Sequence, residues 1–225
     1  MRLAETSLVH QLAPIDETHA GLLPTLILLH GRGANEEDLL SLVPFLSARV
    51  LCIAARAPFE FSFGGYTWYE LRPSGSPDTG QFMKSYHLLL QFLDDIQKSY
   101  PVDPRQTYLL GFSMGAVMAY ALSLTKPGRI KGVVAHSGYI PEDTSLQFQW
   151  GGLQDTSFFV AHGVNDPVIP VEYGRKAKAL LEKTNAPFVY REYPMQHQIS
   201  EESLRDLNAW LLAHVKSATD VARPS

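Results

Sequence analysis

The sequence has little of what marks several large classes of protein. It contains a single cysteine, Cys52, which excludes an intramolecular disulfide and is typical of a chain in a reducing compartment. Because Cys52 lies inside the apolar run from Val50 to Ala55, we expect a buried structural thiol and not a reactive one. No apolar run approaches the ~18 residues that a membrane-spanning helix needs. The sequence therefore predicts neither a disulfide scaffold nor a membrane span.

An excess of charge of one sign is also missing. The net charge is -4 and the pI is near 6.0, which disfavours binding to nucleic acid or to a membrane surface. The segment from Met1 to Ala13 has no continuous apolar stretch and is not typical of a signal peptide, so we expect a cytoplasmic protein. A length of 225 residues predicts one domain over residues 1–225, with a frayed tail over 219–225.

Apolar runs alternate with stretches of helical spacing along the chain. Seven strands are predicted, at Thr6 to Leu12, Thr25 to Leu29, Arg49 to Ala54, Gln106 to Leu110, Ile130 to Ala135, Ser157 to Ala161 and Phe188 to Tyr193. Helices are predicted after Asn35, where Pro44 bends or shortens the helix, over Gln81 to Lys98, over Ala116 to Leu124, around Tyr173 to Leu181 and over Leu204 to Val215. This alternation predicts an α/β fold with a mostly parallel sheet and helices on both faces.

One five-residue motif stands between a predicted strand and a predicted helix. Gly111, Ser113 and Gly115 form the pattern Gly-x-Ser-x-Gly. At a sharp strand-to-helix turn this pattern presents the serine hydroxyl above a sheet, and the glycines leave room for the tight backbone. The motif therefore predicts a nucleophilic serine.

A serine nucleophile needs a base and an acid that orients the base. Asp143 and Asp155 lie far from any strand end, whereas Asp166 lies in a tight turn just after a strand, where reactive groups gather in a parallel sheet. His197 alone among the histidines lies after the last strand and downstream of the acid, while the others that end strands are His30, His136 and His162. Ser113, Asp166 and His197 follow the chain order of α/β-hydrolase triads.

Two donors are expected at the oxyanion that forms during acyl transfer. One is the backbone N–H of Met114, and the other is the backbone of Arg32 in the loop that follows the Thr25 to Leu29 strand. The Arg32 side chain has two open interpretations, which are contact with an acidic substrate group and a surface position. His30 is expected to shape this loop through hydrogen bonds.

A long irregular region from Arg56 to Gly80 is rich in aromatic residues. Pockets are lined mainly by apolar and aromatic side chains, so we expect part of this region to form a substrate wall. The residues predicted to bind substrate are Phe61, Phe63, Tyr66 and Trp68. The alternative, that these aromatic side chains pack only on the domain, remains open. Exposed aromatic residues here would also be compatible with a homodimer.

The motifs together resemble the phospholipase/carboxylesterase family of small α/β-hydrolases, which includes acyl-protein thioesterases and bacterial carboxylesterases. The similar segments are distributed along almost the whole chain and are residues 29–35, 56–58, 65–69, 111–115, 137–139, 162–170 and His197. The resemblance implies an α/β-hydrolase fold without a cap domain, hydrolysis through an acyl-enzyme, and no metal or other cofactor. One departure is visible, because such sequences often carry glycine before the catalytic histidine and this chain has Gln196.

The sequence thus predicts a serine hydrolase of small-molecule esters or thioesters with short to medium acyl chains. A serine peptidase or a lactone hydrolase on the same scaffold is an alternative. Dienelactone-type hydrolases usually have cysteine where Ser113 stands, which disfavours the latter. A non-catalytic ligand-binding protein on the same fold is a third hypothesis, since fold alone does not determine function.

Overall fold

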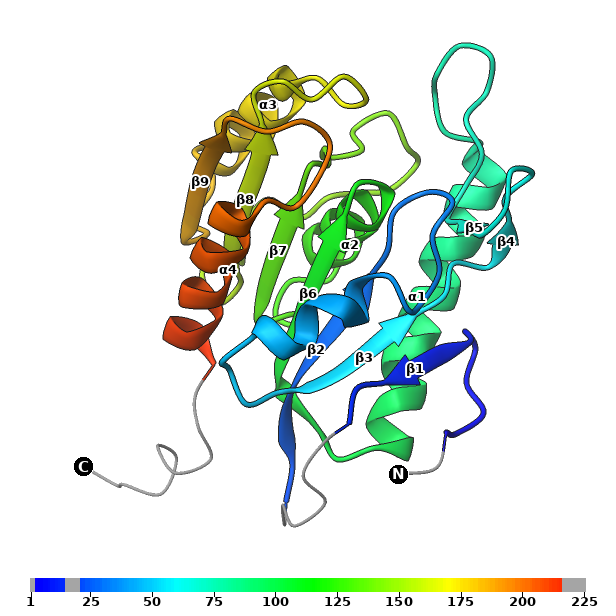
Figure 1. The fold of residues 1–225 in the computed structure, drawn as a ribbon, viewed down its shortest axis with the longest axis vertical. Helices are drawn as coiled ribbons and strands as arrows, with labels where there is room; N and C mark the ends of the chain where they lie inside the picture. Colours follow the sequence, from blue (N-terminus) through cyan, green and yellow to red (C-terminus); the bar gives the residue numbers. More distant parts are fainter. Residues whose placement is uncertain (1–2, 15–20, 216–225) are drawn as a thin grey trace.

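A seven-stranded sheet runs through the molecule (Figure 1). The structure is a computed structural model that describes residues 3–14 and 21–215. All neighbouring strands are parallel except β1, which pairs antiparallel with β3 at one edge. The spatial order is β1 (His10–Leu12), β3 (Leu51–Ala55), β2 (Leu23–Leu29), β6 (Val102–Phe112), β7 (Gly132–His136), β8 (Ser157–Gly163) and β9 (Phe188–Tyr193). The predicted mostly parallel sheet is confirmed.

Helices cover both faces of this sheet, and the side chains of each strand alternate between them. On β2, Ile27 and Leu29 pack against one group of helices, whereas Leu26 and Leu28 pack on the opposite face. The first face carries α1 (Thr79–Ser99), α2 (Met114–Thr125) and α3 (Val171–Leu181). The second carries the short helix η1 (Leu39–Phe45) and α4 (Glu201–His214). Two apolar layers therefore hold the sheet between them.

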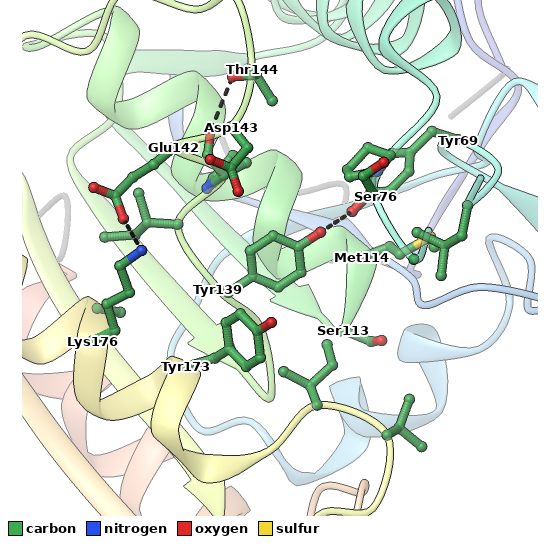
Figure 2. Close-up of a pocket in the computed structure, with 18 of the residues that line it drawn as sticks. Tyr69, Ser76, Ser113, Met114, Tyr139, Glu142, Asp143, Thr144, Tyr173 and Lys176 are labelled. Atoms are coloured by element: carbon green, nitrogen blue, oxygen red, sulfur yellow. Dashed lines mark hydrogen bonds and ion pairs between the residues drawn. The ribbon is translucent and has the colours of Figure 1, made fainter. Parts of the chain in front are cut away.

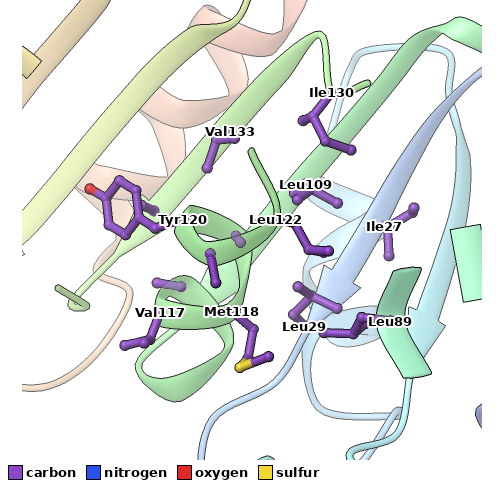
Figure 3. Packing of buried hydrophobic residues seen from close by; sticks show 14 of the residues in the cluster. Ile27, Leu29, Leu89, Leu109, Val117, Met118, Tyr120, Leu122, Ile130 and Val133 are labelled. Atoms are coloured by element: carbon purple, nitrogen blue, oxygen red, sulfur yellow. The ribbon is translucent and has the colours of Figure 1, made fainter. Parts of the chain in front are cut away.

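Helix α2 lies at the centre of the first layer (Figure 3). Every residue of α2 is buried, because α1 and the sheet surround it. Val117, Met118 and Leu122 of α2 pack with residues of β2, β6 and β7. Burial of a large apolar side chain stabilises a fold by about 1.5–3 kcal/mol. The turn that precedes α2, where Ser113 lies, is thus fixed by one of the most buried parts of the protein.

Two predicted regions differ in detail from the structure. The helix predicted after Asn35 is the seven-residue 3-10 helix η1. The Asn35 side chain accepts the N–H of Glu37 and does not cap η1, whose first residue follows Asp38. Pro44 lies inside η1 and lacks the N–H that a continuing α-helix would use, which explains its short length. The region predicted as irregular contains a small hairpin of β4 (Phe59–Glu60) and β5 (Tyr66–Thr67). The predicted frayed tail lies outside the described residues.

Loops that contain candidate site residues lie at the edge of the sheet formed by the carboxyl ends of the parallel strands. Ser113 follows β6, His30 follows β2, and Asp166 follows β8. Within residues 3–14 and 21–215, no helix has the length and apolar character needed to cross a membrane.

Candidate active site

Ser113 lies in a sharp turn between β6 and α2. Its backbone has φ 55° and ψ -121°, a conformation that residues other than glycine rarely adopt. A Cβ on Gly111 would lie 2.4 Å from the carbonyl carbon of Gly115, and a Cβ on Gly115 would lie 1.9 Å from the carbonyl oxygen of Leu29. Both glycines are therefore required by close backbone contacts. The Ser113 N–H donates to the carbonyl of His136 at 2.9 Å, which fixes the turn on β7.

The structure brings together the three residues predicted as a triad. Nε2 of His197 lies 2.9 Å from Oγ of Ser113, and Nδ1 of His197 lies 2.7 Å from Oδ2 of Asp166. Three separate segments supply these side chains, namely the turn after β6, the turn after β8 and the loop between β9 and α4. The Phe112 ring lies 4.9 Å from the His197 ring and supports it from the side.

The Asp166 carboxylate is held by its own turn. Its Oδ1 accepts the N–H groups of Val168 and Ile169 at 2.8 and 2.9 Å, while Oδ2 faces His197. Burial alone would raise the pKa of Asp166, but the hydrogen bonds from His197 and the two amides outweigh it, so the pKa is lowered. The carboxylate therefore stays ionised and can orient a histidine that gains a proton.

The other acids and histidines weighed from the sequence form no hydrogen bond with the Ser113 hydroxyl in the described part of the chain. Asp143 and Asp155 are exposed on the loop after β7. His30, His136 and His162 are at most 1% exposed. Their rings form hydrogen bonds with Gly31, Ser203 and Ile169, respectively. Among the described residues, no group of three or more histidine, cysteine or acidic side chains is arranged to hold a metal ion.

Arg32 and Met114, the residues predicted to supply the oxyanion donors, lie in the segments next to Ser113. Both residues line the same cavity as Ser113, and a Cβ on Gly31 would lie 3.3 Å from the Ser113 Cβ. Within the described part of the chain, neither N–H donates to another protein group. The Arg32 side chain forms an ion pair with Glu70 at 2.7 Å and lies 4.4 Å above the Phe61 ring, so the protein itself already contacts its guanidinium.

A cavity of about 460 Å³ opens beside Ser113 (Figure 2). Its aromatic wall is formed by three tyrosines, Tyr69, Tyr139 and Tyr173, and the hydroxyls of Tyr69 and Tyr139 lie 3.3 Å apart. The apolar residues that complete the wall include Leu71, Ile140, Val168 and Ile169. Lys176 and Glu142, which form an ion pair at 2.5 Å, also line the cavity. The cavity is thus mainly apolar, with an ion pair in its lining.

Among the residues that the structure describes, the four aromatic residues predicted to bind substrate do not line this cavity. Trp68 is fully buried and donates its Nε1–H to the carbonyl of His30 at 2.8 Å. Tyr66 lies under the Arg56 guanidinium, Phe61 lies under Arg32, and Phe63 is 91% exposed at the hairpin tip. The β4–β5 hairpin explains these positions, because it directs the four side chains into the core, onto arginines or into solvent.

The residues that do form the wall carried weaker signals in the sequence. Tyr69 belongs to the same aromatic region but has no spacing that separates it from its neighbours. Tyr139 follows the strand end at Ser137 and Gly138, and that position is a signal that sequence reasoning did not use. Gln196, the departure noted before His197, has an exposed side chain.

Comparisons with known proteins find a matching family, similar sequences and a similar structure. Residues 12–215 match the family model described as Phospholipase/Carboxylesterase. Acyl-protein thioesterase 1 of Saccharomyces cerevisiae is 30% identical over 216 residues, which are 86% of this chain and 93% of that protein. A probable carboxylesterase SOBER1-like of Arabidopsis thaliana is 27% identical over 171 residues, and the match spans 72% of this chain but only 65% of that protein. The crystal structure of the Bacillus cereus carboxylesterase superimposes with a TM-score of 0.80 at 26% identity, covering 92% of this chain and 94% of that one.

Proposed function

The chain belongs to the phospholipase/carboxylesterase family, and from that premise we propose that it is a carboxylic ester hydrolase that acts on esters or thioesters of short to medium acyl chains. Small-molecule sites commonly occupy concave, mainly apolar pockets of about 300–1,000 Å³. The cavity beside Ser113 falls in that range, which supports a small acyl substrate.

The proposed reaction runs through an acyl-enzyme. Nε2 of His197 accepts the proton of the Ser113 hydroxyl, and the serine oxygen attacks the acyl carbonyl. The N–H groups of Arg32 and Met114 stabilise the oxyanion of the tetrahedral intermediate. His197 then gives the proton to the departing alcohol or thiol, and a water molecule repeats the sequence to release the acid. Asp166 orients the ring and stabilises its protonated form throughout.

The observation that carries this proposal is the continuous contact of Ser113, His197 and Asp166. Ser113→Ala removes the nucleophile, so we expect no measurable turnover of p-nitrophenyl acetate and no labelling by a fluorophosphonate probe. The thermal unfolding midpoint of the variant should stay close to that of the wild type, which separates loss of chemistry from loss of fold. Undiminished hydrolysis by the variant would refute the proposal.

A panel of substrates distinguishes the remaining hypotheses. The kcat/KM values are compared for p-nitrophenyl esters of increasing length, acyl-CoA thioesters, a lactone and a peptide. Preference for the lactone or the peptide would favour the alternatives on the same scaffold. A well-folded wild-type protein that turns over none of them would favour a ligand-binding role.

Location and assembly form part of the same proposal. Burial raises the pKa of the Cys52 thiol to about 12, which fits an unreactive structural cysteine in the cytoplasm. The net charge of -4 supports the expectation of no nucleic-acid partner. The exposed Phe63 supports a homodimer, which size-exclusion chromatography with light scattering would detect as twice the chain mass.

A further inference from the structure

Three strands that lead into the site end in buried histidines that the proposed reaction does not use. His30 directly follows β2, His136 is the last residue of β7, and His162 is the penultimate residue of β8. Their exposed fractions are 1%, 0% and 0%. The hydrogen-bond partners of a buried imidazole show which groups the ring holds in place. Nδ1 of His162 has no hydrogen-bond partner among the described residues, so that ring acts through Nε2.

His30 holds the loop that contains Arg32. Its Nδ1 lies 2.7 Å from the carbonyl oxygen of Gly31, and its Nε2 accepts the N–H of Ala57 at 3.0 Å. These partners assign a neutral ring with its proton on Nδ1. Burial lowers the pKa of His30, although the Gly31 carbonyl partly offsets this, so the neutral form is favoured.

The bond to the Gly31 carbonyl has a consequence for the next residue. The Gly31 carbonyl and the Arg32 N–H belong to one planar trans peptide group, so they point in opposite directions. A hydrogen bond that holds the carbonyl therefore also fixes the direction of the N–H that is proposed to stabilise the oxyanion. Rotation of this single peptide group would remove that donor without moving any side chain of the triad.

His162 holds the turn that contains Asp166. Its Nε2–H donates to the carbonyl of Ile169 at 2.7 Å, while the N–H of Ile169 donates to Oδ1 of Asp166. The backbone of Ile169 is thus held at both ends, by the histidine and by the acid. A Cβ on Gly174 of α3 would lie 2.8 Å from Nδ1 of His162, so the ring is also closely packed by that helix.

His136 holds the start of helix α4, which follows His197. Its Nε2 lies 3.0 Å from the hydroxyl of Ser203, and this serine forms a capping box with Ser200. The Ser203 hydroxyl also lies within hydrogen-bond distance of the Ser200 carbonyl oxygen and accepts the Ser200 N–H, so it links His136 to the first turn of α4. Burial lowers the pKa of His136 to about 3, so this ring is neutral too.

We propose that His30, His136 and His162 are positioning residues, each of which fixes one group of the catalytic machinery. His30 fixes the Arg32 N–H, His136 fixes the helix start behind His197, and His162 fixes the turn of Asp166. The inference rests on the proposed function, because it assigns these three roles to support of that reaction. The competing explanation is that the rings only fill space beneath the site.

The two explanations differ in which amide side chain can replace each ring. Asparagine places its amide near the position of Nδ1, whereas the longer glutamine reaches the position of Nε2. The bond that matters is made by Nδ1 in His30 but by Nε2 in His136 and His162. If the hydrogen bonds matter, asparagine should replace His30 best, and glutamine should replace the other two best. If only volume matters, the larger glutamine should be the better substitute at all three positions.

The experiment compares six variants, with asparagine and glutamine at each position, by kcat and KM for p-nitrophenyl acetate and by thermal unfolding. Activity of the wild type is established first, so a failure of the proposed function is recognised before any variant is judged. His30→Asn should keep kcat within about tenfold, and His30→Gln should lose about 100-fold, the usual cost of one oxyanion donor. His136→Asn and His162→Asn should lose about tenfold more than the matching glutamine variants, the cost of roughly one hydrogen bond. KM should change little in all six.

The inference is overturned if glutamine is the better residue at all three positions, or if kcat falls only in proportion to the folded fraction. It is also overturned if no folded variant differs from the wild type by more than about threefold, well below the effect of one hydrogen bond. Should both substitutions of His136 prevent folding, Ser203→Ala tests the same contact from the opposite side. That variant should then lose kcat while KM is kept, and an unchanged kcat would contradict the proposed role.

Discussion

The loops that carry the proposed catalytic groups and the loops that wall the cavity lie side by side, but they are held in different ways. Ser113 and Asp166 are each 7% exposed. The Ser113 N–H bonds to β7, and the N–H groups of Val164 and Asn165, just before Asp166, donate to carbonyls of Tyr193 and Met195. In the wall segment 71–77 every residue except half-buried Pro77 is exposed, as are Glu142 and Asp143, and the backbone hydrogen bonds of these stretches are local. Two side-chain contacts there are local as well, namely the hydroxyls of Ser74 and Ser76, 2.8 Å apart, and the bond from Thr144 to the carbonyl of Pro141.

This difference separates the chemistry from the choice of substrate. Side chains on exposed loops tolerate substitution, whereas buried polar networks lose activity or stability when one member is removed. The same reaction can therefore be kept while the wall changes. Four experiments test this difference, in order of decreasing predicted change.

Replacement of the buried acid should give the largest effect. Asp166→Asn keeps the shape of the side chain but removes the charge that stabilises protonated His197, and an amide favours the wrong ring tautomer. We expect a loss in kcat of about 10⁴-fold, by analogy with other serine hydrolases. The matched control is Asp143→Asn on the cavity wall, which should change kcat less than about threefold, as exposed polar substitutions usually do. A larger loss for Asp143→Asn would reverse the assignment of the two acids.

Gly115→Ala tests how tightly the serine turn is packed. The added Cβ would lie 1.9 Å from the carbonyl oxygen of Leu29, so the strand or the helix must move. We expect the free energy of unfolding to fall by about 3 kcal/mol or more, measured by denaturant titration. Gly151→Ala is the control, since a Cβ there would meet no atom within 4 Å and the residue lies on an exposed loop. Equal destabilisation by both variants would show that the turn is not specially constrained.

The buried histidines predict how stability depends on pH. The pKa of His136 is about 3 in the folded protein against 6.5 for the unperturbed group, so between these values the unfolded state binds the extra proton. Stability therefore falls as pH decreases through this window, by about 1.4 kcal/mol per pH unit for one such group. The lowered pKa values of His10 and His30 act in the same direction.

Urea titrations between pH 4.5 and pH 7 measure this slope. His136→Gln removes one of the groups, so its free energy of unfolding should depend less steeply on pH than that of the wild type. The lowered pKa of Asp166 contributes stability that is lost only as pH falls through and below the usual carboxyl range near 3.8, outside most of this window. An identical slope in the variant would mean that His136 takes up its proton in the folded state.

Changes in the cavity wall should give the smallest effect. Tyr173 is 47% exposed and lines the cavity, so Tyr173→Ala enlarges the space for an acyl chain. We expect the ratio of kcat/KM for butyrate to that for acetate esters to change by about fivefold, within the range of a lost apolar contact. Thermal stability should be unchanged. Val164→Ala, at an exposed position outside the cavity lining, is the control and should leave the ratio as it is.

The parts of the molecule that were predictable from sequence are those with a strong local signal. The strands were visible because Leu26 to Leu29 and Val133 to Ala135 are buried on both faces and are therefore apolar throughout. The contacts of Ser113, Asp166 and His197 followed from strand ends and chain order. The helix expected after Asn35, with Pro44 expected to bend or shorten it, is the short 3-10 helix η1, because Pro44 prevents the regular hydrogen bonds of an α-helix.

The cavity wall had no comparable signal. It is assembled from Tyr69, Tyr139 and Tyr173, which come from three segments far apart in sequence and share no period. Phe61 and Phe63 were predicted to bind substrate, but Phe61 lies under Arg32, and Phe63 is exposed at the hairpin turn with its ring 5.4 Å from that of Phe61. Side-chain directions at such positions depend on tertiary contacts that a single sequence does not reveal.

The backbone conformation of Ser113 also affects which residue laboratory evolution would select at this position. A residue with a side chain at φ 55° carries strain of order 1–3 kcal/mol, which glycine would relieve. A library of variants selected only for resistance to heat should therefore enrich glycine at position 113, whereas a library selected for turnover should retain serine. The two selections favour different residues at this position, so the residue found there shows whether a population was selected for heat resistance or for turnover.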